Sequence, residues 1–519
     1  MIGRASKVWL CNDITFDRNY KHVCDIDNDR MYNLITQHAK YYYENLSFVS
    51  AEKSYITIEE SYINLLDVNY LAFQNANYSN KMFYAFVDKI EYLNNKATRI
   101  YFTIDIWQTW ARECQGSMCF VIREHILNDA IGANKMEEHL DLGDYYCQTS
   151  KYSSIWESVQ EDFYVIMQTT GKFDSNGNIR ANPQFFNSIP SALNYYAFDC
   201  TTEGLAELQD TIQVIVNKGQ TNTIVGLFLA PKKFCGARGL DYSLSSNFGA
   251  TRLIDSMPYI NNFFGYSPKN KKLLQYPYCY HLITNGQGAS ALIRPEKFKV
   301  KDQAHQFSIS GAVCPGCSII CCPQDYNNYL YSYNDSIQAG KFPQVAWAGD
   351  AYTNWLVNNG ISLANSLFQS QSKLVKGSIK GDVEDVIDSA FSIAQSMRES
   401  ELAELLPPQF GGNINSGDVM FSINNLNIMY SNMSIDAEHA MAIDDYFTKF
   451  GYATNQLKEP NLTGRPFWNY VQISSDDTYY KSGATADVLE ELNNILRSGV
   501  TIWHDYNSMY DYEQDNSTK

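Results

Sequence analysis

Four cysteines stand close together in the segment CPGCSIICC, which contains Cys314, Cys317, Cys321 and Cys322. Four thiolates can hold a zinc ion in a tetrahedron, and zinc ribbons usually supply them as two separated CxxC pairs. Here the second pair is adjacent, and neighbouring side chains on a strand point to opposite faces. We therefore favour a Pro-Gly turn between two strands, with cysteine as a small apolar residue, and we predict no metal site.

Three acidic residues recur at the spacing of a calcium loop, namely Asp25, Asp27 and Asp29 in CDIDNDRMYN. An EF-hand needs glycine at its sixth position and glutamate at its twelfth. This chain has Arg30 and Thr36 there, so we predict a solvated turn.

Catalytic motifs do not appear in the sequence. The eight histidines form no HxxxH or HxH pair, and there is no P-loop, GxSxG or GxGxxG motif. Paired carboxylates such as Glu59 and Glu60 are adjacent, so on a strand they face apart and cannot work as an acid and a base on one bond. We predict that the protein is not an enzyme and uses no cofactor.

The charge balance is acidic, with 40 lysines and arginines against 57 aspartates and glutamates, a formal net charge of −17. A sequence-specific reader of nucleic acid would need a basic face for phosphates. An acidic wall repels phosphate, which suits a conduit that DNA must pass without binding. The 38 tyrosines suit strands and subunit interfaces, because tyrosine buries a ring and keeps a polar tip.

The first residues, MIGRASKVWLCNDITF, contain no apolar core of a secretory signal. No stretch offers the roughly twenty apolar residues of a transmembrane helix. We expect a protein made in a cytoplasm, with its twelve cysteines reduced.

A long hairpin is predicted between Lys81 and Trp110. Asn94-Asn95-Lys96 supplies a turn, because asparagine tolerates positive φ. In the second arm apolar residues alternate with polar ones, which is typical of a half-buried strand; they are Ile100, Phe102, Ile104 and Ile106.

The pattern along the chain predicts a mainly β protein with an α+β insert, in five segments. They are a β-rich domain at 1–125, an α/β or β-rich insert at 126–265, a β-meander at 266–345, a helical hairpin at 346–410 and a second β-rich part at 411–519. The insert has strands predicted at 163–171 and 221–231 and a helix at 202–219. A hairpin is predicted at 281–293, and one short helix at 485–499.

Two helices are predicted in the fourth segment, at 350–380 and 382–406, and Pro407 and Pro408 end the second. The second helix carries an apolar stripe of Val383, Val386, Ile387, Ala390, Phe391, Ala394 and Met397. Because these residues recur at steps of three and four, they share one helix face. We interpret the stripe as the packing face of a lumenal plug or tip loop.

Opposite charges meet where the two predicted helices would turn. The first helix ends in Lys373, Lys376 and Lys380, and the second opens with Asp382, Glu384, Asp385 and Asp388. Cations suit a helix C-terminus and anions an N-terminus, so a helical hairpin is electrostatically consistent. Ionised carboxylates are costly at the centre of a bilayer, which argues against a membrane span at neutral pH.

Several ordered motifs resemble one family. They include IDIWQTW (104–110), FVIREH (120–125), PPQFGGN (407–413), YFTKFGYATNQLKEPNLTGRPFWNYVQ (446–472) and SGVTIWH (498–504). The chain resembles the distal tail knob proteins of small short-tailed bacteriophages of Gram-positive hosts, the Salasmaviridae and their relatives. The residues that carry the match are Trp107, Trp110, Arg123, Pro407, Pro408 and Trp503.

The resemblance implies a structural virion protein, assembled in the host cytoplasm. It implies tail-tube-like β-barrel or sandwich domains that form a homohexameric ring, with a helical loop plugging the lumen until infection. Implied partners are the collar or connector protein, a tail-tip lysin, and double-stranded DNA that passes without sequence recognition.

Two alternatives remain open from the sequence. Residues 126–265 match the family poorly and could recognise host cell-wall carbohydrate. In relatives the segment before the Pro-Pro pair is long, glycine-rich and apolar and is thought to enter the host membrane. Here 362–409 is shorter and charged, so a membrane-pore role is the weaker expectation.

Overall fold

A computed structural model describes most of the chain outside the fourth predicted segment. The described residues are 6–46, 54–75, 81–153, 159–173, 179–180, 184–186, 189–191, 193–218, 223–235, 253–285, 289–311, 318–326, 337–341, 344–345, 347–348, 410–411 and 428–517. They form two compact units. Unit 1 comprises 1–143, 265–273 and 437–519, and unit 2 comprises 144–264 and 274–436. The five-segment division is finer than these units and stays a prediction.

The first sheet of unit 1 has six strands in the order β3-β1-β5-β6-β7-β4. Their bounds are β1 Ser6–Asn12, β3 Ala39–Leu46, β4 Tyr55–Ile58, β5 Val68–Asn75, β6 Met82–Asn94 and β7 Ala97–Ile104. The hairpin predicted around Asn94 is confirmed, because β6 and β7 pair antiparallel across that turn. The expectation that Ile106 continues the strand is wrong. Asp105 caps a short helix there, α2 Ile106–Trp110, by accepting a bond from the Gln108 amide.

The centre of this sheet is buried on both faces. On β5, Tyr70 and Ala72 belong to one hydrophobic cluster and Leu71 and Phe73 to another. Successive side chains of a strand point to opposite faces, so two cores need an unbroken apolar run. That run is YLAF at 70–73.

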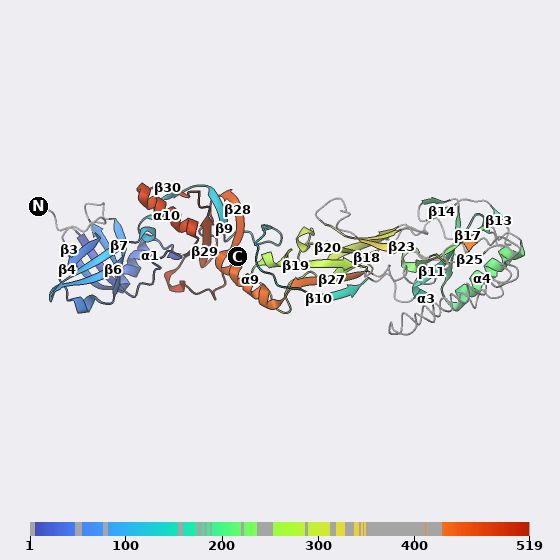
Figure 1. The fold of residues 1–519 in the computed structure, drawn as a ribbon, viewed down its shortest axis with the longest axis horizontal. Helices are drawn as coiled ribbons and strands as arrows, with labels where there is room; N and C mark the ends of the chain where they lie inside the picture. Colours follow the sequence, from blue (N-terminus) through green and yellow to red (C-terminus); the bar gives the residue numbers. More distant parts are fainter. Residues whose placement is uncertain are drawn as a thin grey trace. The chain divides into compact units, whose positions relative to one another are not determined.

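The second sheet of unit 1 has the order β2-β31-β29-β9-β28. Its strands are β2 His22–Cys24, β9 Cys119–Glu124, β28 Tyr452–Lys458, β29 Trp468–Ile473 and β31 Val500–Trp503, with the small pair β8 Gln115–Gly116 and β30 Tyr480–Ser482 alongside. The first and last parts of the chain, blue and red in Figure 1, therefore build one unit. The predicted helix near 485–499 is confirmed as α10 Ala486–Ser498.

Besides α2, two further helices of the described part of unit 1 were not predicted. The segment 1–125 was expected to hold only strands and turns, but Asp27 caps α1 Asn28–His38 through the Arg30 amide. The solvated turn predicted from Asp25, Asp27 and Asp29 is therefore wrong in part, because Asp27 is the helix cap and Asp29 lies in the first helical turn. The expectation of a single helix in 411–519 is also wrong, because α9 Ala437–Phe450 lies there. The buried face of α9 contains Asp444, and this carboxylate interrupts the apolar stripe by which a helix is recognised.

Unit 2 contains three four-stranded sheets with the orders β10-β27-β19-β20, β18-β21-β22-β23 and β16-β11-β17-β24. The first comprises β10 Tyr145–Tyr152, β19 Cys279–Thr284, β20 Ser290–Ile293 and β27 Met429–Ile435. The second comprises β18 Leu253–Met257, β21 His305–Gly311, β22 Ser318–Pro323 and β23 Ile337–Lys341. The third comprises β11 Phe163–Thr169, β16 Asn194–Asp199, β17 Ile224–Pro231 and β24 Gln344–Val345.

Short pairs and helices complete unit 2. The pairs are β12 Lys172–Phe173 with β13 Ile179–Arg180, β14 Gln184–Phe186 with β15 Ile189–Ser191, and β25 Trp347–Ala348 with β26 Phe410–Gly411. The helices are α3 Val159–Asp162, α4 Thr202–Asn217 and α5 Lys232–Cys235. The strands predicted at 163–171 and 221–231, the hairpin at 281–293 and the helix at 202–219 are confirmed by β11, β17, the β19–β20 pair and α4.

Candidate functional site

The most elaborate polar cluster among the described residues lies in unit 1. Chain segments distant in sequence meet there: the end of β9, the loop after it, residues 265–273, helix α9, strand β28 and the C-terminal segment. We call this cluster the polar knot.

Glu138 is the first centre of the polar knot. Its carboxylate receives Lys272 Nζ and the Arg123 guanidinium, and it accepts a bond of 2.9 Å from the Ala453 amide. Burial lowers the pKa of Lys272 although Glu138 favours its charged form. Buried charges require such partners because desolvation is expensive. The contacts tie the loop at 138 to β9, β28 and residue 272.

Asp444 on α9 is the second centre. It accepts bonds from the Tyr266 hydroxyl at 2.7 Å, the Lys269 amide at 2.7 Å and both the amide and the side chain of Asn270, at 3.0 and 2.9 Å. Four donors compensate for the burial of this carboxylate. These hydrogen bonds hold the segment 265–273 against α9.

His125, at the end of β9, uses both ring nitrogens. Nδ1 accepts a bond of 2.7 Å from the Tyr470 amide, and Nε2 donates to the Thr448 carbonyl at 3.1 Å. Burial lowers the pKa of His125 to about 3, and the nearby Arg465 charge acts in the same direction. A neutral imidazole with both nitrogens occupied has no free position for acid–base chemistry.

The C-terminal segment closes the polar knot. Asn516 Oδ1 accepts bonds from the Phe467 and Trp468 amides at 3.1 and 3.3 Å, and its Nδ2 donates to the Trp468 carbonyl at 2.8 Å. The Arg465 guanidinium donates to the Asn516 carbonyl at 3.1 Å. These hydrogen bonds hold the C-terminal segment at Asn516 against residues 465–468.

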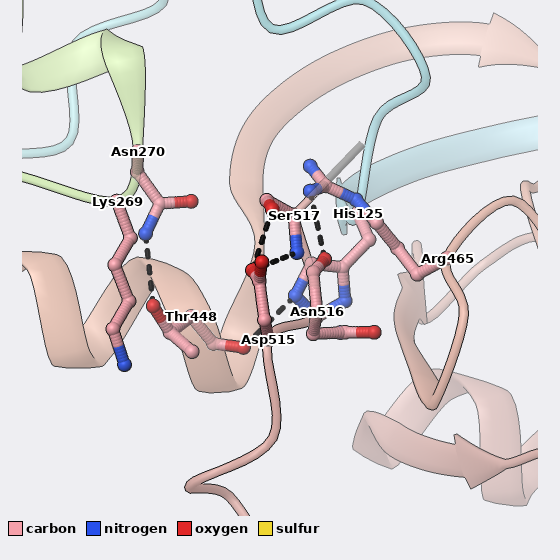
Figure 2. Close-up of a pocket in the computed structure, with 8 residues that line it drawn as sticks. All are labelled: His125, Lys269, Asn270, Thr448, Arg465, Asp515, Asn516 and Ser517. Atoms are coloured by element: carbon pink, nitrogen blue, oxygen red, sulfur yellow. Dashed lines mark hydrogen bonds between the residues drawn. The ribbon is translucent and has the colours of Figure 1, made fainter. Parts of the chain in front are cut away.

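A small pocket lies beside His125 and Asn516, in one part of the polar knot, and Figure 2 shows the residues that line it. Its volume is about 10 Å³, which is room for about one water molecule. The residues that line it are His125, Lys269, Asn270, Thr448, Arg465, Asp515, Asn516 and Ser517. Such a volume excludes any organic substrate, so we assign the polar knot a structural role.

The residues that carry the family match and that the structure describes do not form one site. Trp107 is buried beside α10, while Trp110 is half-buried with the Lys81 ammonium 3.3 Å from its ring centroid. Trp503 is fully buried against Trp468, with ring centroids 5.0 Å apart. Arg123 alone belongs to the polar knot, where its guanidinium also lies 4.8 Å from the ring centroid of Tyr446.

The remaining predicted residues lie outside the described part of the chain. They are the stripe Val383, Val386, Ile387, Ala390, Phe391, Ala394 and Met397, the charges Lys373, Lys376, Lys380, Asp382, Glu384, Asp385 and Asp388, and Pro407 and Pro408. Their roles stay predictions. Within the described residues no helix is long and apolar enough to cross a membrane.

The strand–turn–strand interpretation of the cysteine segment is confirmed for its described part, because β21 and β22 pair antiparallel. Cys321 contacts the Tyr430 hydroxyl at 3.5 Å, and Cys322 contacts the Ser308 hydroxyl at 3.4 Å. Cys314 and Cys317 lie outside the described residues. Within the described residues no group of three or more potential metal ligands occurs.

Sequence reasoning singled out only Arg123 of the polar knot by residue, although His125 and Arg465 lie within the quoted motifs 120–125 and 446–472. Glu138, Lys272, Asp444 and Asn270 belong to no motif. The signal that could have found Asp444 is a charged residue among the apolar positions of a helix face, since it is buried on α9 together with Ile443 and Phe447.

Comparisons with known proteins match most of the chain. A family model described as the C-terminal domain of Bacillus phage phi29 tail knob protein gp9 matches residues 246–517, and one described as the N-terminus of caudoviral major tail proteins matches 4–115. Tail knob proteins gp9 of Bacillus phages phi29 and PZA are each 24% identical to the chain, with 96% of both sequences covered.

The solved structure of the bacteriophage C1 tail knob protein gp12 has the same fold. It matches with a TM-score of 0.61 at 14% identity, covering 97% of this chain and 98% of that chain. The predicted fold class, mainly β with tail-tube-like domains, is confirmed. The relatives are structural tail knob proteins, and they indicate no catalytic family.

Proposed function

The chain belongs to the family of phage tail knob proteins represented by gp9, and from this premise we propose that it forms a hexameric ring at the distal end of the tail. It is a structural protein of the virion and part of the tail of a short-tailed phage. The proposed ring is a conduit through which the genome leaves the capsid during infection.

The six-stranded sheet of unit 1 is the observation that carries this proposal. It occupies the region that matches major tail proteins, and among the described strands β3 and β4 form its two edges with one neighbour each. Exposed edge strands invite pairing with another chain, and closed rings of identical subunits cover them. Tyrosines on β3 and β4 suit such a contact; Tyr42 and Tyr55 are exposed.

The acidic balance of the chain, −17, fits the proposed passage of DNA. Phosphate is repelled from an acidic wall, so DNA would slide without sequence recognition. The proposed partners of the ring are the collar or connector protein on one side and a tail-tip lysin on the other. Residues 346–410 are proposed as a lumenal plug that is pushed out when DNA leaves.

Light scattering and negative-stain imaging of the purified protein test the ring. We expect ring-shaped particles with a mass near six times 59.2 kDa. A particle of one chain mass at every salt concentration and at the highest soluble protein concentration would contradict the proposal, as would an open fibre.

A second candidate function, recognition of the host wall, has one observation in its favour. Tyr146 and Phe264, in the insert predicted at 126–265, are about half exposed and lie 6.3 Å apart edge to face. Sugars stack on exposed aromatic rings. Binding of the protein to purified cell walls should fall in Tyr146→Ala but not in Tyr92→Ala, which removes an exposed tyrosine of unit 1. Equal binding by both variants would count against this candidate.

A further inference from the structure

Two histidines of unit 2 form a buried pair that joins two sheets. His281 on β19 belongs to the β10-β27-β19-β20 sheet, and His305 begins β21 of the β18-β21-β22-β23 sheet. The distance from His281 Nε2 to His305 Nδ1 is 2.6 Å, and the residues are 0% and 2% exposed. A hydrogen bond between side chains of two sheets therefore lies inside their common hydrophobic cluster.

The hydrogen bonds around the pair define where its protons lie. Asn432 Nδ2 donates to the Pro258 carbonyl at 3.1 Å, so its Oδ1 is the atom that faces His281 Nδ1 at 2.7 Å. His281 Nδ1 thus carries a hydrogen, and its Nε2 accepts from His305 Nδ1–H. His305 Nε2 is then a bare nitrogen, and it is buried without a hydrogen-bond partner among the described residues.

The walls around the two rings are apolar. The Phe298 ring stacks on His305 with centroids 3.9 Å apart and planes 2° from parallel. Phe298 and Phe307 also meet the His281 ring edge to face, at 6.1 and 6.0 Å. An added charge would therefore enter a region of low polarity.

The carboxylates of the neighbouring elements are committed elsewhere. Asp255 on β18 accepts the Tyr430 hydroxyl at 3.1 Å, and Glu296, in the 3-10 turn Pro295–Lys297, accepts the Tyr276 amide at 3.0 Å. Among charged groups, only His281 acts on His305, and it disfavours a second positive charge. The backbone of Lys301 favours the charged form of His305, but less strongly than burial opposes it.

We propose that the His281–His305 pair is an acid-labile joint between the two sheets of unit 2. While both rings are neutral the joint is closed. In acid a solvent proton adds to His305 Nε2, and the resulting charge has no counter-ion and only the Lys301 backbone to favour it. The sheets must then separate locally so that water reaches the ring. The inference does not depend on the proposed ring or plug.

The direction of the pH effect follows from burial. It lowers the pKa of His281 to about 4 and that of His305 to about 3, from an ordinary value of 6.5. A depressed imidazole pKa means that the opened state binds protons more readily than the closed state. The joint is therefore fully stable above about pH 6.5 and is weakened progressively as the pH falls toward those values.

Hydrogen exchange with mass spectrometry on the intact protein tests the joint. After correction for the chemical pH dependence of exchange, peptides covering β19 and β21 should open at least about tenfold more often at pH 5 than at pH 7. The variant His281→Gln with His305→Asn replaces both rings with neutral amides and should lose most of that acceleration. The control His38→Gln changes a partly exposed histidine of unit 1 and should keep it.

Two results would contradict the proposal of an acid-labile joint. One is a wild-type protein whose β19 and β21 peptides show no acceleration in acid. The other is the same acceleration in the double variant, which would assign it to other groups. If the double variant fails to fold, His305→Phe takes its place, because a phenyl ring keeps the stack on Phe298 and cannot be protonated.

Discussion

Glu138 and Lys272 form an ion pair in which each side chain is only 1% exposed. The two residues are 134 positions apart in sequence. Lys272 Nζ also lies 5.1 Å from the ring centroid of Tyr452, and the Arg123 guanidinium approaches the other side of the carboxylate. Two cations thus share one buried carboxylate, which joins segments of unit 1 that are distant in sequence.

Glu138→Gln should destabilise unit 1 strongly. The change leaves Lys272 and Arg123 buried without a counter-ion, and breaking a buried pair in this way costs about 3–5 kcal/mol. Urea denaturation followed by tryptophan fluorescence, to which the buried Trp468 and Trp503 contribute, measures the loss. The control Glu490→Gln breaks an ion pair whose carboxylate is 57% exposed and should cost less than about 1 kcal/mol. Equal effects of the two changes would contradict the prediction.

The stability of unit 1 should fall in acid through His125. Its pKa is lowered to about 3 in the folded state, so the unfolded state binds a proton first. The contribution is complete above about pH 6.5 and decreases by roughly 1.4 kcal/mol for each pH unit below that value. In His125→Asn this part of the pH dependence should disappear. Denaturation curves of both proteins between about pH 7 and pH 5 check this, and parallel stability profiles would refute it.

Asn516→Ala should loosen the C-terminal segment. The change leaves the Phe467 and Trp468 amides and the Trp468 carbonyl without their partner, and each unsatisfied buried group costs about 1–3 kcal/mol. Unfolding in urea should show the loss, together with faster removal of the segment by a protease. Glu513, an exposed residue of the same segment, gives a matched control. The variant Glu513→Ala should behave like the unaltered protein.

The cysteine segment should carry no zinc. Cys321 and Cys322 are consecutive on β22, and they contact Tyr430 and Ser308, respectively. Their thiols therefore cannot converge on one ion without breaking the strand. Elemental analysis of the purified protein should find zinc well below one atom per chain; one atom per chain would show that this reasoning fails.

The intact protein should release little dye from liposomes at pH 7. The predicted plug carries Asp382, Glu384, Asp385 and Asp388, and an ionised carboxylate at the centre of a bilayer costs several kcal/mol. Strong leakage that vanishes on deletion of 362–404 would restore the membrane-pore role. Leakage confined to acid would mean that protonated carboxylates permit insertion.

Local patterns in the sequence determined much of the secondary structure. The existence of the β6–β7 hairpin follows from alternation and from the polar residues at its turn, which the structure places at Asn95-Lys96 without a positive φ. Helix α10 follows from its apolar face and from the glycine at 499, which ends it with φ 83°. These signals are local because each depends on the backbone geometry of a few consecutive residues. The ordered motifs likewise identified the family before any coordinates, since matches in a fixed order need no knowledge of contacts.

The tertiary structure decided which polar residues are buried and which partners make that burial possible. Glu138, Lys272, Asp444 and the His281–His305 pair have no signature in a window of sequence, because a charge or an imidazole is buried only where distant segments supply its hydrogen bonds. The same holds for α9, whose buried Asp444 breaks the apolar stripe and is compensated by residues 266–270. Periodicity records which face of an element is apolar; the compensation of a buried polar group exists only once the chain has brought its partners together.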